Sequence, residues 1–277
     1  MAPIARLTAL ALVFSAAFVN AAPALAPYDT SSPPPALTTT ENYASAVEPV
    51  AAGPILSKRA TATVITTCTK PGTIAITFDD GPSEFTDGLL DFLKKKNAKV
   101  TFFLNGNNYG NIENHKDVVK RAYKDGHQIA SHTYSHADLA TLSKKKIETE
   151  MKSLDTIIKK IIGVRPTYMR PPYGSFNKLA LDTLGSMGYK VINWDRDTQD
   201  WQHPDKVLTS LKVYEKSFKE AKALTNAGHI FLQHDTNRLT ALELGPKAID
   251  MALKLGYKVV TVGSCLGNND PKSWYRV

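Results

Sequence analysis

The stretch TIAITFDDGP, residues 73–82, decides how this sequence is interpreted. Its apolar run from Ile74 to Phe78 predicts a β-strand, and two adjacent carboxylates, Asp79 and Asp80, stand at the end of that strand. A Gly-Pro pair follows. Taken alone this is also an ordinary turn, because Asp, Gly and Pro are common turn formers. The two carboxylates therefore indicate a functional site only if other reactive side chains lie close to them in the folded chain.

A pair of histidines, His132 and His136, lies further along the chain. The two residues are four apart, so one turn of helix or a tight loop would point both imidazoles in the same direction. Two histidines and one aspartate supply the three protein ligands of a catalytic zinc site, which leaves a fourth position open. The second aspartate would then be free for proton transfer.

Three further polar clusters follow apolar, strand-like runs. They are RPPYG at 170–174, DTQDW at 197–201 and QHD at 233–235. Five clusters at five strand ends are hard to explain as ordinary turns. The carboxyl ends of parallel strands are where α/β proteins gather catalytic groups.

Short β-rich runs alternate with longer amphipathic stretches, which predicts an α/β fold with parallel strands covered by helices. Periodicity alone does not distinguish a closed barrel from an open doubly wound sheet. One helix is marked by Leu89, Leu90 and Leu93, and another extends from Ile147 to Ile161. The strand-like runs are 74–78, 100–104, 128–131, 167–169, 191–194, 229–232 and 258–261.

The motifs TFDDGP, HTYSH, RPPYG, DTQDW and LQH stand in the order of a known family. Over residues 70–262 the chain resembles the polysaccharide deacetylases with a NodB homology domain, carbohydrate esterase family 4, which includes fungal chitin deacetylases. The resemblance implies a distorted (β/α)7 barrel, in keeping with seven strand-like runs. It also implies a metal-dependent hydrolase that acts on acetylated polysaccharides.

The resemblance assigns a metal site and a base. Asp80, His132 and His136 correspond to the family's ligands for one divalent ion, for which Zn²⁺ is expected and Co²⁺ or another divalent ion is the alternative. Asp79 corresponds to the general base that activates the attacking water. Arg170 corresponds to an arginine that contacts and orients this base, although a purely structural ion pair would use the same residue type.

The resemblance also assigns an acid and a substrate pocket. His234 corresponds to the acid that protonates the leaving amine, and Asp200 to a carboxylate that would raise its pKa from about 6.5. The backbone N–H of Tyr173 corresponds to a donor to the developing oxyanion. Trp201 and Leu232 correspond to walls of the acetyl pocket, with a buried core tryptophan as the alternative for Trp201.

The N-terminal segment has the composition of processing material. Arg6 precedes an apolar run, residues 7–19, which small residues follow, so residues 1–21 are interpreted as a secretory signal peptide. A transmembrane helix is the competing interpretation, but the apolar run is short for a span of about 20 residues.

Residues 22–59 are rich in Pro, Ala, Ser and Thr, and we expect a disordered prosegment. The segment ends in the dibasic pair Lys58-Arg59, which suggests proteolytic maturation, with a plain linker as the alternative. The catalytic domain would then comprise residues 60–277. Its two cysteines, Cys68 and Cys265, are expected to form a disulfide in a secreted chain, with two free thiols as the alternative.

The net charge of +8 excludes few partners. Lysine runs at 94–96 and 144–146 are typical of solvated helix faces, and no spacing of aromatic residues with cations indicates a nucleic-acid site. We also expect no stable membrane association, because no apolar tail for a lipid anchor is present. A monomer is expected, secreted or bound to the cell wall.

The sequence therefore predicts a secreted chitin deacetylase that converts N-acetylglucosamine units of chitin or chito-oligosaccharides to free amines and acetate. An acetylxylan esterase or a peptidoglycan deacetylase on the same fold is the first alternative. An inactive carbohydrate-binding relic is the second.

Overall fold

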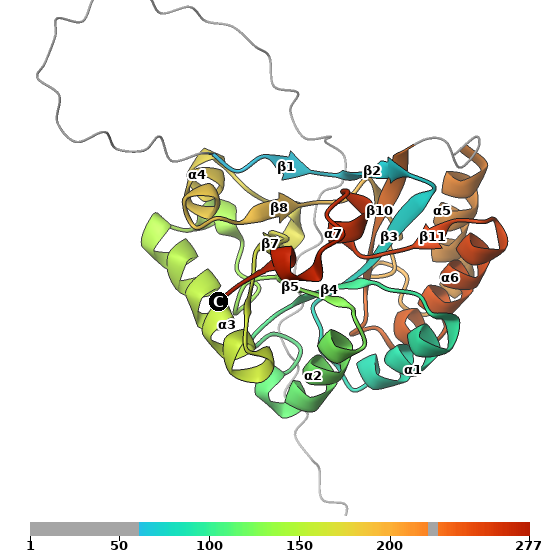
Figure 1. Ribbon diagram of the computed structural model, residues 1–277, viewed down its shortest axis with the longest axis horizontal. Coiled ribbons are helices and arrows are strands. Elements are labelled where there is room, and N and C mark those ends of the chain that lie inside the picture. The colour runs from blue at the N-terminus through green and yellow to red at the C-terminus, as the bar shows by residue number, and fades with distance from the viewer. Residues whose placement is uncertain (1–60, 221–226) are drawn as a thin grey trace, which may run out of the picture. The chain divides into compact units, whose positions relative to one another are not determined.

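The structure, a computed structural model, describes residues 61–220 and 227–277 (Figure 1). The expected signal peptide, prosegment and dibasic pair lie outside the described residues. Six parallel strands form the centre, in the spatial order β8-β7-β5-β4-β3-β10. Their bounds are β3 (Thr73–Asp79), β4 (Thr101–Leu104), β5 (Gln128–Ser131), β7 (Tyr168–Met169), β8 (Lys190–Ile192) and β10 (Ala227–His234).

The gap between β8 and β10 is closed by short strands and not by a further long strand. At one end, β1 (Val64–Ile65) pairs in parallel with β8, and β2 (Thr67–Pro71) pairs antiparallel with β10. At the other end, β9 (Arg196–Asp197) pairs in parallel with β10. The sheet is thereby nearly closed, which confirms the expected distorted barrel and excludes the open doubly wound sheet.

The seventh predicted strand is β11 (Lys258–Val259), which pairs in parallel with the first residues of β3. All seven predicted strand regions therefore contain strands, with differences at their ends. A separate antiparallel pair joins β6 (Arg165–Pro166) to β12 (Tyr275–Arg276).

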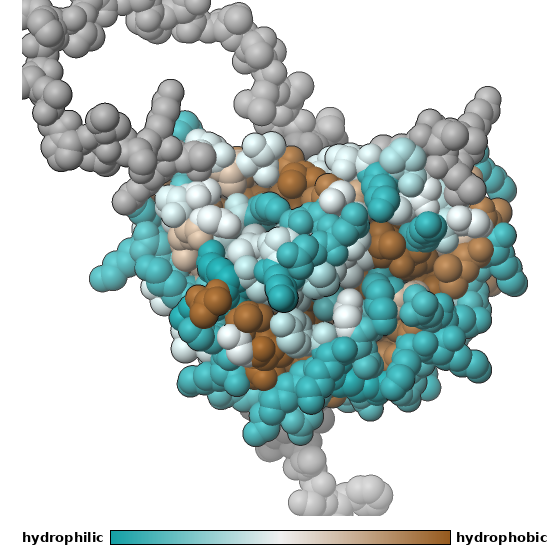
Figure 2. Space-filling model, in the orientation of Figure 1, coloured by the Kyte–Doolittle hydropathy of each residue, from teal (hydrophilic) through white to brown (hydrophobic). Residues whose placement is uncertain are grey.

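Helices surround the sheet (Figure 1). The outer surface of the helices at the lower rim is hydrophilic in Figure 2. The α-helices are α1 (Thr86–Lys96), α2 (Lys116–Lys124), α3 (Lys144–Ile162), α4 (Lys178–Ser186), α5 (Val207–Glu220), α6 (Gly245–Lys254) and α7 (Val262–Cys265). Single turns of other helix types are η1 (Ile112–His115), η2 (Leu139–Thr141), η3 (Pro172–Gly174), η4 (Thr240–Leu244) and η5 (Pro271–Trp274).

Alternation along the strands creates two cores. On β3, Ile74, Ile76 and Phe78 pack outward in one cluster with apolar residues of the helices, including Leu89 and Leu93. Each buried side chain of this size contributes about 1.5–3 kcal/mol relative to exposure. The intervening positions face the barrel interior, where every central strand supplies one residue: Ala75, Phe103, Ala130, Tyr168, Ile192 and Ile230.

Helix α7 closes the end of the barrel at which the strands begin. The N–H groups of Val262 and Gly263 donate to Thr101 Oγ1 and Gln128 Oε1, both at 2.9 Å, which satisfies donors at the start of this short helix. The expected disulfide joins Cys265 of α7 to Cys68 of β2. The disulfide ties β2, which helps to close the barrel, to α7, which covers the end of the barrel. The alternative of two free thiols is therefore wrong.

Candidate functional site

Strand alternation carries four reactive side chains to the mouth of the barrel, the end opposite α7. Asp79 is the last of the alternate positions on β3 that face the barrel interior, and His234 occupies the paired position on β10. His132 and Arg170 continue the sheet beyond β5 and β7, because the His132 N–H bonds to Leu104 O and the Arg170 N–H bonds to Ser131 O. Four motifs distant in sequence therefore meet at one place.

Asp80, His132 and His136 converge on a point beside this mouth. The distance from Asp80 Oδ1 to the Nε2 atom is 3.6 Å for His132 and 3.2 Å for His136. Burial lowers the pKa of both imidazoles to about 3, so both rings are neutral and carry a free lone pair. Because His132 Nδ1 lies 2.8 Å from the Arg170 carbonyl, Nδ1 carries the proton and the lone pair of Nε2 is available to a metal ion.

The residues fit a metal ion. Their three ligand atoms lie within 4.8 Å of one another, and Asp80 Oδ1 is buried without a hydrogen-bond partner. Burial also raises the pKa of Asp80 to about 6, which is a penalty that a bound cation would offset. The φ angles of Asp80 and His136 are +70° and +58°, a conformation that is uncommon for residues other than glycine and that clusters at functional sites.

Asp79 forms a buried ion pair with Arg170. Arg170 Nη1 donates to Asp79 Oδ1 at 2.7 Å and to Thr77 Oγ1 at the same distance. The guanidinium also lies over the Phe103 ring, 4.2 Å from its centroid. Burial raises the pKa of Asp79 and Arg170 opposes that shift. The pair leaves Asp79 Oδ2 facing the metal ligands, 3.8 Å from His132 Nε2.

His234 is paired with Asp200, which lies in the loop after β9. His234 Nδ1 lies 2.9 Å from Asp200 Oδ1, and the His234 backbone N–H donates to Asp200 Oδ2 at 2.8 Å. Burial lowers the pKa of His234, but Asp200 and the nearby aspartates outweigh burial and raise it to about 10. The imidazole is therefore protonated at neutral pH, with its Nε2–H available as an acid.

The residues of the expected substrate pocket contact different residues, Tyr173 the ring of His136, and Leu232 and Trp201 the residue Asp197. The Tyr173 ring is exposed and packs edge-on against His136, with 4.6 Å between the ring centroids. Leu232 is buried on β10 and pairs with Asp197, whose side chain accepts a 3.5 Å hydrogen bond from Trp201 Nε1. Trp201 is 48% exposed, which excludes the alternative of a core tryptophan.

Sequence reasoning missed two threonines that donate hydrogen bonds to Asp200. Thr240 Oγ1 donates to Asp200 Oδ2 at 2.8 Å, and Thr198 Oγ1 donates to Asp200 Oδ1 at 3.2 Å. Burial raises the pKa of this carboxyl, but His234 and Thr240 outweigh burial and hold the pKa below its usual value. Thr198 lies inside a recognised motif, but Thr240 is forty residues away from Asp200 in a helix-like stretch, where no pattern marks it.

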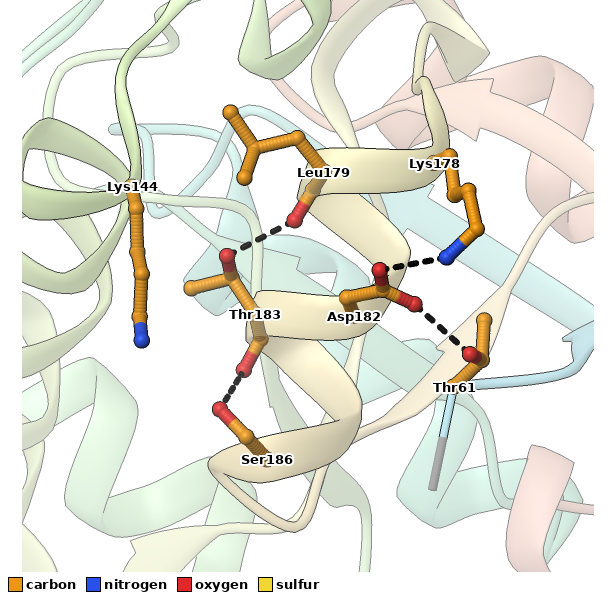
Figure 3. Close-up of a pocket in the computed structure, with 7 residues that line it drawn as sticks. All are labelled: Thr61, Lys144, Lys178, Leu179, Asp182, Thr183 and Ser186. Atoms are coloured by element: carbon orange, nitrogen blue, oxygen red, sulfur yellow. Dashed lines mark hydrogen bonds and ion pairs between the residues drawn. The ribbon is translucent and has the colours of Figure 1, made fainter. Parts of the chain in front are cut away.

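A surface pocket of about 340 Å³ lies apart from these motifs, along α4 (Figure 3). Its one carboxylate, Asp182, is already bound to Lys178 Nζ at 2.7 Å and to Thr61 Oγ1 at 2.6 Å. Its lining contains no histidine. We therefore place the candidate active site at the barrel mouth.

Comparisons with known proteins show which family this chain resembles. A family model described as Polysaccharide deacetylase matches residues 66–192. A chitin deacetylase from Pestalotiopsis sp is 47% identical over 214 residues, which are 77% of this chain and 70% of that protein. A probable peptidoglycan-N-acetylglucosamine deacetylase from Arthroderma benhamiae is 45% identical over 217 residues, 77% of this chain and 48% of that protein. The chitin deacetylase structure from Colletotrichum lindemuthianum matches with a TM-score of 0.74 and 40% identity, covering 78% of this chain and 96% of that chain.

Proposed function

Because this chain belongs to the polysaccharide deacetylase family, we propose that it hydrolyses the N-acetyl groups of N-acetylglucosamine units in chitin or chito-oligosaccharides. The C–N bond of the amide breaks and a C–O bond forms, so the products are acetate and a free amine on the sugar. The observation that carries this proposal is the convergence of two neutral imidazoles and the Asp80 carboxylate with a second carboxylate, Asp79, and a protonated imidazole, His234, at one barrel mouth.

We propose that Asp80, His132 and His136 hold one Zn²⁺ or a similar divalent ion. When bound, such an ion acidifies a water toward a pKa of about 7 and polarises a carbonyl oxygen. Histidine nitrogens with one carboxylate are a common donor set of catalytic zinc sites. The orphaned Asp80 Oδ1 supports this assignment.

In this proposal Asp79 and His234 move the protons. Asp79 Oδ2 accepts the proton of the attacking water, while Arg170 engages Oδ1 and keeps the carboxylate oriented. His234 then donates its Nε2 proton to the departing amine nitrogen, and Asp200 stabilises the imidazolium before that transfer. The neighbouring positions of Asp79 and His234 on β3 and β10 support this division of roles.

Tyr173, Trp201 and Leu232 are proposed to hold the acetyl group. The Tyr173 N–H follows two prolines, which lack N–H groups, and the residue adopts a φ of +61° in a tight turn beside His136. We assign this N–H to the developing oxyanion. Trp201 and Leu232 would line the methyl side, because both are joined to Asp197.

Peptidoglycan is the second candidate substrate, because a 45% identical relative carries that printed activity. Acetate release from chito-oligomers, peptidoglycan and acetylated xylan would separate the candidates. We expect release from the chito-oligomers with matching loss of one acetyl mass per step. Release from peptidoglycan or xylan alone would contradict the chitin assignment, and no release from any substrate would favour the binding relic.

We further propose that residues 1–21 direct secretion and that cleavage follows Lys58-Arg59. No helix within the described residues is long and apolar enough to span a membrane. The disulfide supports an oxidising compartment. Intact mass of the protein recovered from culture medium tests both cleavages, and a mass that includes residues 22–59 would contradict the second.

A further inference from the structure

The two histidines at the proposed metal site are held differently. The ring of His132 is fixed by the hydrogen bond from Nδ1 to the Arg170 carbonyl. The ring of His136 contacts Asp80 and packs against the rings of His132 and Tyr173. Among the described residues it has no carbonyl or carboxylate partner for its other nitrogen. Ligand histidines usually have such a partner, which holds the ring in place. Because His136 lacks one among the described residues, the position of its ring depends more on the backbone that carries it.

That backbone is strained. Thr133 and His136 both have positive φ angles, +69° and +58°, and each such residue costs about 1–3 kcal/mol unless neighbouring contacts hold it. On one side the loop is held by the residues after β4. The N–H groups of Gly106 and Asn107 donate to the Tyr134 carbonyl at 2.9 and 2.7 Å.

On the other side a single carboxylate holds the loop. Glu150 Oε2 accepts from the Ser135 backbone N–H and Glu150 Oε1 accepts from the Ser135 hydroxyl, both at 2.8 Å. Ser135 directly precedes His136. Glu150 is itself well placed, because the flanking α3 residues Ile147 and Met151 are buried in the core.

We propose that Glu150 is a positioning residue that fixes the metal ligand His136 through Ser135. Both oxygens of its carboxylate engage Ser135, so rotation of the Tyr134–Ser135 peptide unit and of the Ser135 side chain, one residue before His136, is restrained. This inference rests on the proposed metal site. It predicts that loss of the Glu150 carboxylate weakens metal binding although Glu150 does not touch the ion.

Zinc affinity of the full chain, measured by competition with a chromophoric chelator, tests the inference. Glu150→Ala is expected to lose about tenfold in affinity, the lower end of the effect of outer partners of metal ligands, because Ser135 is exposed. Glu150→Gln should retain most of the affinity, because its amide can accept from the N–H and donate to the hydroxyl. Glu148→Ala is the matched control, since it removes the same charge from α3, where Glu148 pairs with Lys152.

Affinity of Glu150→Ala equal to that of Glu148→Ala would overturn the inference. If the wild-type chain binds no zinc, the proposed metal site itself fails, so the two failures are distinguishable. If Glu150→Ala does not fold, Ser135→Ala decides. That variant loses the hydroxyl contact and is expected to bind zinc more weakly than the Glu148→Ala control, and an affinity equal to the control would contradict the inference.

Discussion

Asp79 has two carboxylate oxygens in different surroundings, one bound by Arg170 and the other facing the metal ligands. Asp79→Asn keeps the shape and an acceptor for Arg170 but removes the basic oxygen. We expect kcat to fall by about 10²–10⁴-fold, the usual contribution of a general base. Metal content, measured by elemental analysis, should remain at the wild-type value. A near-normal kcat would refute Asp79 as the base.

In the proposed mechanism, Asp200 sets the pH range over which His234 acts as the acid. Burial lowers the pKa of this imidazole and Asp200 raises it, with a result of about 10. In Asp200→Asn the raising interaction weakens and the pKa falls, so the proton is lost at a lower pH. The alkaline limb of the kcat/KM profile should therefore move to lower pH, with the loss of activity growing as pH rises.

Asp205→Asn is the control for this pH shift, because Asp205 is exposed on the same stretch of chain. Its profile should match that of the wild type. An Asp200→Asn profile with an unchanged alkaline limb would mean that another group donates the proton.

At the scale of elements, β2 and α7 are joined by the disulfide across a separation of 197 residues. Replacing Cys68 and Cys265 by serine should lower the free energy of unfolding by about 2–5 kcal/mol, because the unfolded chain gains conformational freedom. Urea unfolding of the wild type and the double variant measures this loss. Zinc affinity of the folded variant should be unchanged, since the disulfide lies at the end opposite the mouth. A variant of equal stability would show that the bridge has no structural role.

The strands and their motifs could be predicted from the sequence because the same alternation that buries Ile74 and Ile76 also directs Asp79 into the barrel. Closure by β1, β2 and β9 could not be predicted. These strands are short, and their pairing partners lie far along the chain. The closed barrel was expected from the resemblance to the family, because the hydrophobic periodicity of the sequence fits an open sheet equally well.

The same limit applies within the site. The proposed metal ligands and the proposed base lie in recognisable motifs, and the structure brings these residues close together. In the sequence, Thr240 and Glu150 look like ordinary helix residues. Their hydrogen bonds to Asp200 and to Ser135 form only when the chain folds. Long-range hydrogen bonds to a loop leave no local pattern.

For the whole molecule, chemistry and stability are located at opposite ends of one barrel. The mouth contains buried, unpartnered or strained groups such as Asp80 and His136, whereas the other end is sealed by α7, its hydrogen bonds and the disulfide. This division is typical of parallel barrels, in which residues at the carboxyl ends of the strands serve catalysis. The sealed end can thus offset the cost of a strained mouth.

Acetate release from defined chito-oligomers by metal-stripped protein, titrated with zinc, shows whether a bound metal ion is required for catalysis. We expect that stripped protein is inactive, that activity returns in proportion to zinc and levels off at one equivalent, and that His132→Ala does not recover. Full activity of the stripped protein, or recovery of His132→Ala equal to that of the wild type, would contradict a catalytic metal held by Asp80, His132 and His136.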